Sequence, residues 1–183
     1  MKLYLARHAQ TNYNIQKLAN SDPSVDVHLS EEGIKQAKNL GKLLEAVDFD
    51  IVFISELPRT RETAGYINDY HHNEYIIDGR LNDNKTGFES QPVDEWLKAL
   101  DDSDNRWDAK FNGGESLNEA ASRARDFIEF LKTQPYESVL VVTHGFLTQA
   151  IFGYIENKSL EEAAEFNLLQ GTYAEFDLTA IKQ

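Results

Sequence analysis

Three polar clusters of the sequence contain the residue types that bind and transfer phosphoryl groups. Arg7 and His8 follow an apolar run at the start of the chain, and Arg59 comes shortly after a second run. His144 follows a third run. Arginine keeps its charge and presents a fork of donors that matches phosphate oxygens, and a neutral imidazole can attack phosphorus. The sequence therefore predicts an electropositive pocket for a small anion such as a phosphoryl group.

A carboxyl group is also needed, because the departing oxygen of a phosphoryl transfer takes up a proton. The loop after Leu81 offers two candidates, Asp83 and Glu89. A carboxyl group donates at neutral pH only when burial or a neighbouring negative charge raises its pKa, and an incoming phosphate supplies such a charge. We expect one of these two residues to be the acid.

The polar clusters stand at the ends of expected strands. Apolar runs at 2–6, 50–54 and 138–142 are typical of buried strands, with a weaker candidate at 74–77 and an alternating edge strand at 172–178. Strands that alternate with helices predict an α/β fold, a three-layer α/β/α sandwich around a mainly parallel sheet. Ligands of such sheets bind beyond the carboxyl ends of the strands, where the clusters fall.

Helices are expected between these strands. Ser30 and Ser116 are placed to cap two of them, and Pro58 to occupy the first turn of another. Further helices are expected at 146–154 and 159–165. The polar stretch 82–91 and the acidic stretch 101–104 are interpreted as insertions within one domain that spans residues 1–183.

Composition narrows the possible partners. The 18 Lys and Arg against 31 Asp and Glu give a net charge of −13, which disfavours nucleic acid and anionic membranes. The chain has no cysteine, which excludes disulfides, thiolate zinc sites and cysteine nucleophiles. No membrane span or targeting pattern is visible, so we expect a cytoplasmic protein. The sequence does not indicate an oligomeric state.

Six blocks of the sequence resemble the histidine phosphatase superfamily, also called phosphoglycerate mutase-like. Residues 5–14 resemble the family's Arg-His-Gly-x-Thr-x-x-Asn signature. The blocks follow the family's order and cover residues 3 to about 150. The other five lie at 29–37, 55–64, 81–89, 113–116 and 141–145.

The resemblance implies a role for each matching residue. His8 would be the nucleophile that is phosphorylated, and Asp83 stands where the family usually has a glutamate as proton donor. The residues expected to hold the phosphoryl group are Arg7, Asn14, Arg59, His144 and Gly145.

Three positions depart from the family pattern. Ala9 replaces the usual glycine after the nucleophile, so its backbone must suit a residue with a Cβ. Asp83 is one methylene shorter than glutamate, which leaves Glu89 as an alternative acid and substrate contact. Asn20 stands where glycine is common, and asparagine tolerates the left-handed region.

The resulting hypothesis is a phosphomonoester hydrolase that acts on a small phosphorylated metabolite through a phosphohistidine on His8. No metal or cofactor is expected, because arginines and histidines already neutralise the phosphoryl oxygens. Two alternatives stay open. One is a phosphoglycerate mutase, and the other is a regulatory module that binds phosphate without turnover.

Overall fold

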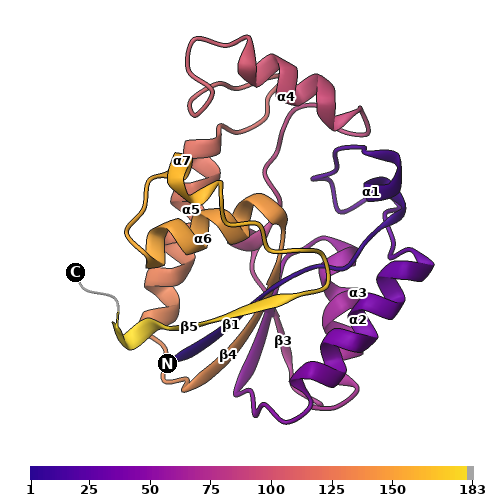
Figure 1. The fold of residues 1–183 in the computed structure, drawn as a ribbon, viewed down its shortest axis with the longest axis vertical. Helices are drawn as coiled ribbons and strands as arrows, with labels where there is room; N and C mark the ends of the chain where they lie inside the picture. Colours follow the sequence, from indigo (N-terminus) through magenta and orange to yellow (C-terminus); the bar gives the residue numbers. More distant parts are fainter. Residues whose placement is uncertain (181–183) are drawn as a thin grey trace.

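The computed structural model describes residues 1–180, which contain a five-stranded sheet in the order β3-β2-β4-β1-β5 (Figure 1). Strands β3, β2, β4 and β1 run parallel to one another, and the edge strand β5 is antiparallel to β1. The mainly parallel sheet and the expected edge strand are confirmed. The strands are β1 (Lys2–Arg7), β2 (Ile51–Ile54), β3 (Tyr75–Ile77), β4 (Ser138–Thr143) and β5 (Tyr173–Asp177).

The register of the three inner strands brings their carboxyl ends to one edge. Arg7 of β1 pairs with Thr143 of β4, and Ile54 of β2 pairs with Val142 of β4. The residues that follow these strands therefore emerge side by side. This is why His8, Ser55 and His144, far apart in the sequence, start from neighbouring positions.

Helices cover both faces of the sheet, as the three-layer expectation required (Figure 1). Successive strand residues point to opposite faces, so Leu3 and Leu5 pack in one core cluster and Tyr4 and Ala6 in the other. The first cluster includes side chains of α5 (Leu117–Lys132) and α6 (Gly145–Ile155). The second includes side chains of α2 (Glu31–Leu44) and α3 (Pro58–Asn68).

The helix starts also follow the sequence signals. The Ser30 hydroxyl accepts from the Gly33 amide at the start of α2, and Ser116 forms a reciprocal capping box with Glu119 at the start of α5. Pro58 occupies the first turn of α3. The last helix expected, 159–165, is shorter in the structure, where α7 is Leu160–Ala163.

Two helices were not expected. These are α1 (Asn12–Gln16) and α4 (Val93–Asp101), and two 3-10 turns, η1 (Gly79–Leu81) and η2 (Leu178–Ala180), were also missed. In Figure 1, α4 stands above the sandwich and outside its layers. Its nine residues begin after Pro92 without a side-chain cap, between two polar stretches, which explains why no start signal marked it. Within residues 1–180, no helix has the length and apolarity that crossing a bilayer requires.

Candidate active site

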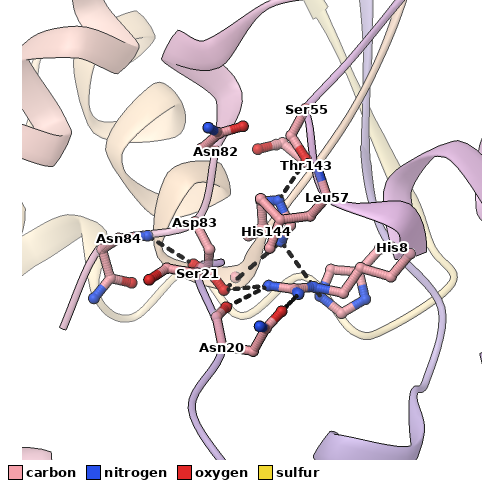
Figure 2. A network of polar contacts seen from close by, with 12 residues as sticks. His8, Asn20, Ser21, Ser55, Leu57, Asn82, Asp83, Asn84, Thr143 and His144 are labelled. Carbon is pink, nitrogen blue, oxygen red and sulfur yellow. Dashed lines mark hydrogen bonds and ion pairs between the residues drawn. The ribbon is translucent and has the colours of Figure 1, made fainter. Parts of the chain in front are cut away.

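The side chains of His8, Asn20, Asp83 and His144 converge at the carboxyl edge of the sheet (Figure 2). His8 follows β1 and His144 follows β4, and their ring centroids are 5.1 Å apart. Arg59, from the first turn of α3, bonds to both rings. The structure thus brings together His8, Arg59 and His144, which the sequence placed at strand ends, with Asn20 and Asp83 from two loops.

Two hydrogen bonds determine the tautomer of His8. Its Nδ1 lies 2.8 Å from the Ala9 carbonyl oxygen, and its Nε2 lies 3.2 Å from Nε of Arg59. A carbonyl only accepts and a guanidinium only donates, so the proton is on Nδ1 and Nε2 keeps its lone pair. Burial, and then the charge of Arg59, hold the pKa of His8 well below its usual range. The ring is therefore neutral, and its Nε2 electron pair accepts the hydrogen bond of Arg59 within the site.

His144 has the opposite tautomer for the same kind of reason. Its Nδ1 accepts from Nε of Arg59 at 3.2 Å, so its proton is on Nε2, which donates to the Ser55 hydroxyl at 2.9 Å. Ser55 is held in turn by the Thr60 hydroxyl at 2.9 Å. Burial and the Arg59 charge lower the pKa of His144 well below its usual range. One guanidinium N–H is therefore shared by two neutral imidazoles.

Arg59 is the centre of the network and is only 4% exposed. Its Nη1 donates to the side-chain oxygen of Asn20, and its Nη2 donates to the Asn20 carbonyl and to Oδ2 of Asp83, both at 3.0 Å. These partners fix the plane of the guanidinium. From the sequence, Asn20 was considered only because asparagine tolerates a left-handed backbone. Its φ is not positive, and it contributes to the site through its side chain, which accepts from Arg59.

The carboxyl group of Asp83 lies close to both the charged Arg59 and the neutral His144. Besides Arg59, its Oδ2 lies 3.7 Å from Nδ1 of His144. Burial raises the pKa of Asp83 above its usual value, although Arg59 acts in the opposite direction. A raised pKa suits a carboxyl group that donates a proton.

The loop that carries Asp83 is held by Arg123 of α5. Arg123 donates to the carbonyls of Arg80 and Asp83 at 2.8 and 3.1 Å, and forms a two-point pair with Glu115 at 2.7 and 3.1 Å. The sequence analysis missed this residue. No local pattern distinguishes Arg123 from Arg125, because its contacts depend on how α5 packs beside the loop.

Arg7 supplies a second guanidinium with unused donors. Its Nη1 bonds to the Leu168 carbonyl at 3.0 Å, while its Nε is buried and has no partner within the described residues. A Cβ at Gly145 would lie 3.1 Å from the Arg7 guanidinium, so glycine there lets Arg7 lie against the start of α6. That helix begins without a side-chain cap, which leaves its first amides for another acceptor.

Asn14 and Gly145 line the same cavity as Arg7, His8, Arg59 and Asp83. The side-chain oxygen of Asn14 accepts from the amide and hydroxyl of Thr11, at 3.0 and 2.9 Å. Its amide nitrogen therefore turns away from Thr11. Ala9 has no positive φ, and its amide donates to the Thr63 hydroxyl at 3.0 Å, so the departure from glycine introduces no backbone strain.

Glu89 lies apart from this cavity and lines a second one. Its Oε1 accepts from the side-chain amide of Asn20 at 2.8 Å, and its Oε2 accepts from the amide of Ser21 at 2.7 Å and from its hydroxyl at 3.1 Å. Glu89 thus fixes the loop that carries Asn20, and hydrogen bonds connect it to Arg59 through that side chain. Among residues 1–180, no cluster of three or more His, Asp or Glu side chains is arranged to hold a metal.

The sequence is similar to those of several proteins named as phosphatases. The chain is 28% identical over 185 residues to adenosylcobalamin/alpha-ribazole phosphatase of Escherichia coli, covering 97% of this chain and 90% of that protein. It is 36% identical over 136 residues to fructose-2,6-bisphosphatase TIGAR of Xenopus tropicalis, covering 70% of this chain. The chain spans 49% of that protein and 35% of a yeast fructose-2,6-bisphosphatase.

The fold has close counterparts among solved structures. The alpha-ribazole phosphatase from Shigella flexneri superimposes with a TM-score of 0.86 at 28% identity, over 97% of this chain and 90% of that one. The family model of the histidine phosphatase superfamily (branch 1) matches residues 3–182. The chain therefore belongs to the histidine phosphatase superfamily.

Proposed function

We propose that this chain is a phosphomonoester hydrolase that forms a phosphohistidine on His8. The observation that carries the proposal is the fixed tautomer of His8, which directs the Nε2 lone pair into a cavity. The same cavity is lined by two arginines, one of which has a buried and unpartnered donor among the described residues. A nucleophile and an anion-binding arrangement therefore meet at one place.

In the first step, Nε2 of His8 attacks phosphorus and the bond from phosphorus to the ester oxygen breaks. The phosphoryl oxygens replace the two imidazoles as acceptors of the Arg59 Nε–H while Asn20 and Asp83 keep the guanidinium in place, and Nε of Arg7 gains its missing partner. The arriving dianion favours the protonated form of His144, so His144 takes up a proton from solvent at Nδ1 and donates a hydrogen bond from this atom to a phosphoryl oxygen. These donors stabilise the charge that develops on the equatorial oxygens.

The departing oxygen takes its proton from Asp83, and the second step reverses the role of this carboxyl group. Water attacks phosphorus of the phosphohistidine, Asp83 accepts a proton from that water, and the bond from phosphorus to Nε2 of His8 breaks, so that phosphate leaves. Asp83 is favoured over Glu89 because it lines the cavity and contacts Arg59 directly. Within residues 1–180, the side chain of Glu89 accepts hydrogen bonds from residues 20–22 and not from Arg59.

The two relatives and the solved structure compared above are named as phosphatases, which supports the hydrolase proposal, while a relative that is 30% identical over 154 residues is named as a probable phosphoglycerate mutase. The substrate in this proposal is a small phosphorylated metabolite. Phosphoglycerate mutase activity and binding without turnover remain the alternatives to be tested.

The test is to incubate the purified chain with p-nitrophenyl phosphate and, separately, with 3-phosphoglycerate. We expect release of inorganic phosphate from p-nitrophenyl phosphate, and no 2-phosphoglycerate from the second compound. Formation of 2-phosphoglycerate would identify a mutase. Absence of turnover with p-nitrophenyl phosphate, combined with tight binding of vanadate, would identify the binding module.

A further inference from the structure

The cavity has a second end, away from the phosphoryl-binding residues and beneath α4. Four residues of α4 line it, Val93, Trp96, Leu97 and Leu100, and Trp107 lines it from the following loop. Their spacing of i, i+3, i+4 and i+7 places the four on one face of the helix. Such a face normally packs on a protein core. Here it forms a wall of a cavity of about 340 Å³, and Leu97 remains 38% exposed.

Three of the four charged residues that line this cavity, Arg7, Arg59 and Asp83, belong to its phosphoryl end. Apart from Arg7 and Arg59, the one cation that lines it in residues 1–180 is Arg106. Arg106 is already engaged, since it pairs with Asp101 at 3.5 Å and lies over the ring of Trp107, 5.5 Å from the centroid. The charge of Asp101 offsets that of Arg106, so the α4 end carries no net positive charge that would favour a second phosphate or a carboxylate of a substrate.

We propose that the substrates of this chain are phosphomonoesters whose alcohol carries a flat apolar group, such as an aromatic ring, and no second anion. This inference rests on the proposed function, because it names the occupant of the same cavity. The phosphoryl group would lie at His8, and the ring would lie between α4 and the loop that carries Trp107. Aromatic side chains provide large contact areas for such rings, and the apolar area buried at this wall favours them over small alcohols.

Two substrates separate this inference from ordinary phosphatase activity. 2-Phenylethyl phosphate and ethyl phosphate both release a primary alcohol of similar acidity, so the ratio of their kcat/KM values reports on the α4 end alone. We expect 2-phenylethyl phosphate to be preferred by about tenfold or more. 3-Phosphoglycerate should be no better than ethyl phosphate. Equal values for the two esters, or a preference for 3-phosphoglycerate, would overturn the inference.

Substitutions on α4 locate the source of the preference. Trp96→Ala should reduce the ratio of the two kcat/KM values about tenfold, and Trp96→Phe should keep most of it. Glu95→Gln is the matched control, because Glu95 is the neighbouring residue, is exposed and does not line the cavity. Its ratio should equal that of the wild type. A ratio that Trp96→Ala leaves unchanged would show that α4 does not contact the alcohol.

Binding of phosphonates separates failure of this inference from failure of the proposed function. The chain has two tryptophans and both line the cavity, so tryptophan fluorescence reports its occupation directly. 2-Phenylethylphosphonate should bind about tenfold more tightly than ethylphosphonate and should change the fluorescence more. If neither ester is hydrolysed but 2-phenylethylphosphonate still binds more tightly, the hydrolase proposal is wrong. Binding of an aromatic group at the α4 end is then still supported. If both phosphonates bind equally, the inference fails whether or not the chain is an enzyme.

Discussion

The two ends of one cavity are built in opposite ways. At the phosphoryl end, His8 and His144 follow strands and Arg59 lies at the start of a helix. Hydrogen bonds hold the side chain of each of them in place. At the α4 end the wall consists of apolar side chains on a short helix outside the sandwich (Figure 1). The first end is positioned by the sheet itself. The second can change its side chains without disturbing the sheet.

This difference indicates that the residues for phosphoryl transfer and the residues for substrate specificity lie at different ends of the cavity. Changes at the phosphoryl end should affect every substrate, because all substrates share the phosphoryl group. Changes at the α4 end should affect substrates according to the group beyond the ester oxygen. A change at Asp83 should have an intermediate effect. It should depend on the substrate, but only through the acidity of the departing alcohol. The predictions below test this separation, beginning with the largest effect.

Replacing the nucleophile should abolish turnover of all substrates alike. His8→Ala is expected to lower kcat by about 10³-fold or more, because the covalent route is lost. kcat should be measured with an aromatic and an alkyl ester. His72→Asn is the control, since His72 is exposed and has a positive φ that asparagine tolerates. Normal turnover by His8→Ala would contradict the phosphohistidine mechanism.

Removing a phosphoryl-binding arginine should weaken binding of the bare anion. Arg7→Ala is expected to raise the inhibition constant for vanadate by about 10- to 100-fold, because charge-assisted hydrogen bonds are lost. Arg61→Ala is the matched control, since Arg61 is exposed and does not line the cavity. If both variants keep wild-type inhibition, the anion binds elsewhere.

Removing the proposed acid should produce an effect that depends on the leaving group. Asp83→Asn is expected to lower kcat/KM by about 10²-fold or more for an alkyl phosphate, and much less for p-nitrophenyl phosphate, whose phenolate leaves without a proton. In the wild type, kcat/KM for the alkyl ester should fall as pH rises through the raised pKa of Asp83. Glu89→Gln should slow both substrates by the same small factor, because Glu89 acts through Asn20. A loss selective for alkyl esters in Glu89→Gln alone would make Glu89 the acid.

The smallest expected effect concerns stability. The folded-state pKa values of His8 and His144 lie well below 6.5, so the unfolded chain binds more protons as pH falls below about 6.5. The free energy of unfolding should therefore decrease below that pH, by at most about 1.4 kcal/mol per pH unit for each ring. His28, whose pKa is raised by Glu62, acts in the opposite direction.

Denaturant unfolding between pH 7 and 5 measures this dependence. His8→Ala removes one of the two buried rings, so its stability should fall less steeply with decreasing pH than that of the wild type. An unchanged slope would mean that the His8 ring is not held neutral in the folded protein.

The phosphoryl end could be predicted from the sequence because its signals are local. A buried apolar run followed at once by Arg7-His8 or by His144 places each side chain at a strand end, and parallel strands bring those ends together. Asn20 and Arg123 could not be found in this way. Both are positioned by contacts between segments distant in the sequence, Asn20 with Arg59 and Arg123 with the Asp83 carbonyl.

The helix α4 was missed for a different physical reason. The apolar stripe of α4 is four residues long and lies between polar stretches, so a helix of nine residues had no cap or long periodic pattern to mark it. The extent of the domain, residues 1–183, the cytoplasmic location and the roles of the site residues stay predictions.

The central claim is that Nε2 of His8 carries the phosphoryl group, and the site of phosphorylation tests it most directly. The chain should be mixed with a substrate, quenched in alkali, where phosphohistidine is stable, and studied by mass spectrometry and by NMR that correlates phosphorus with ring nitrogens. We predict a single adduct on the peptide that contains His8, with phosphorus bonded to Nε2, because Nδ1 donates to the Ala9 carbonyl. An adduct on His144, or on Nδ1 of His8, would contradict this account.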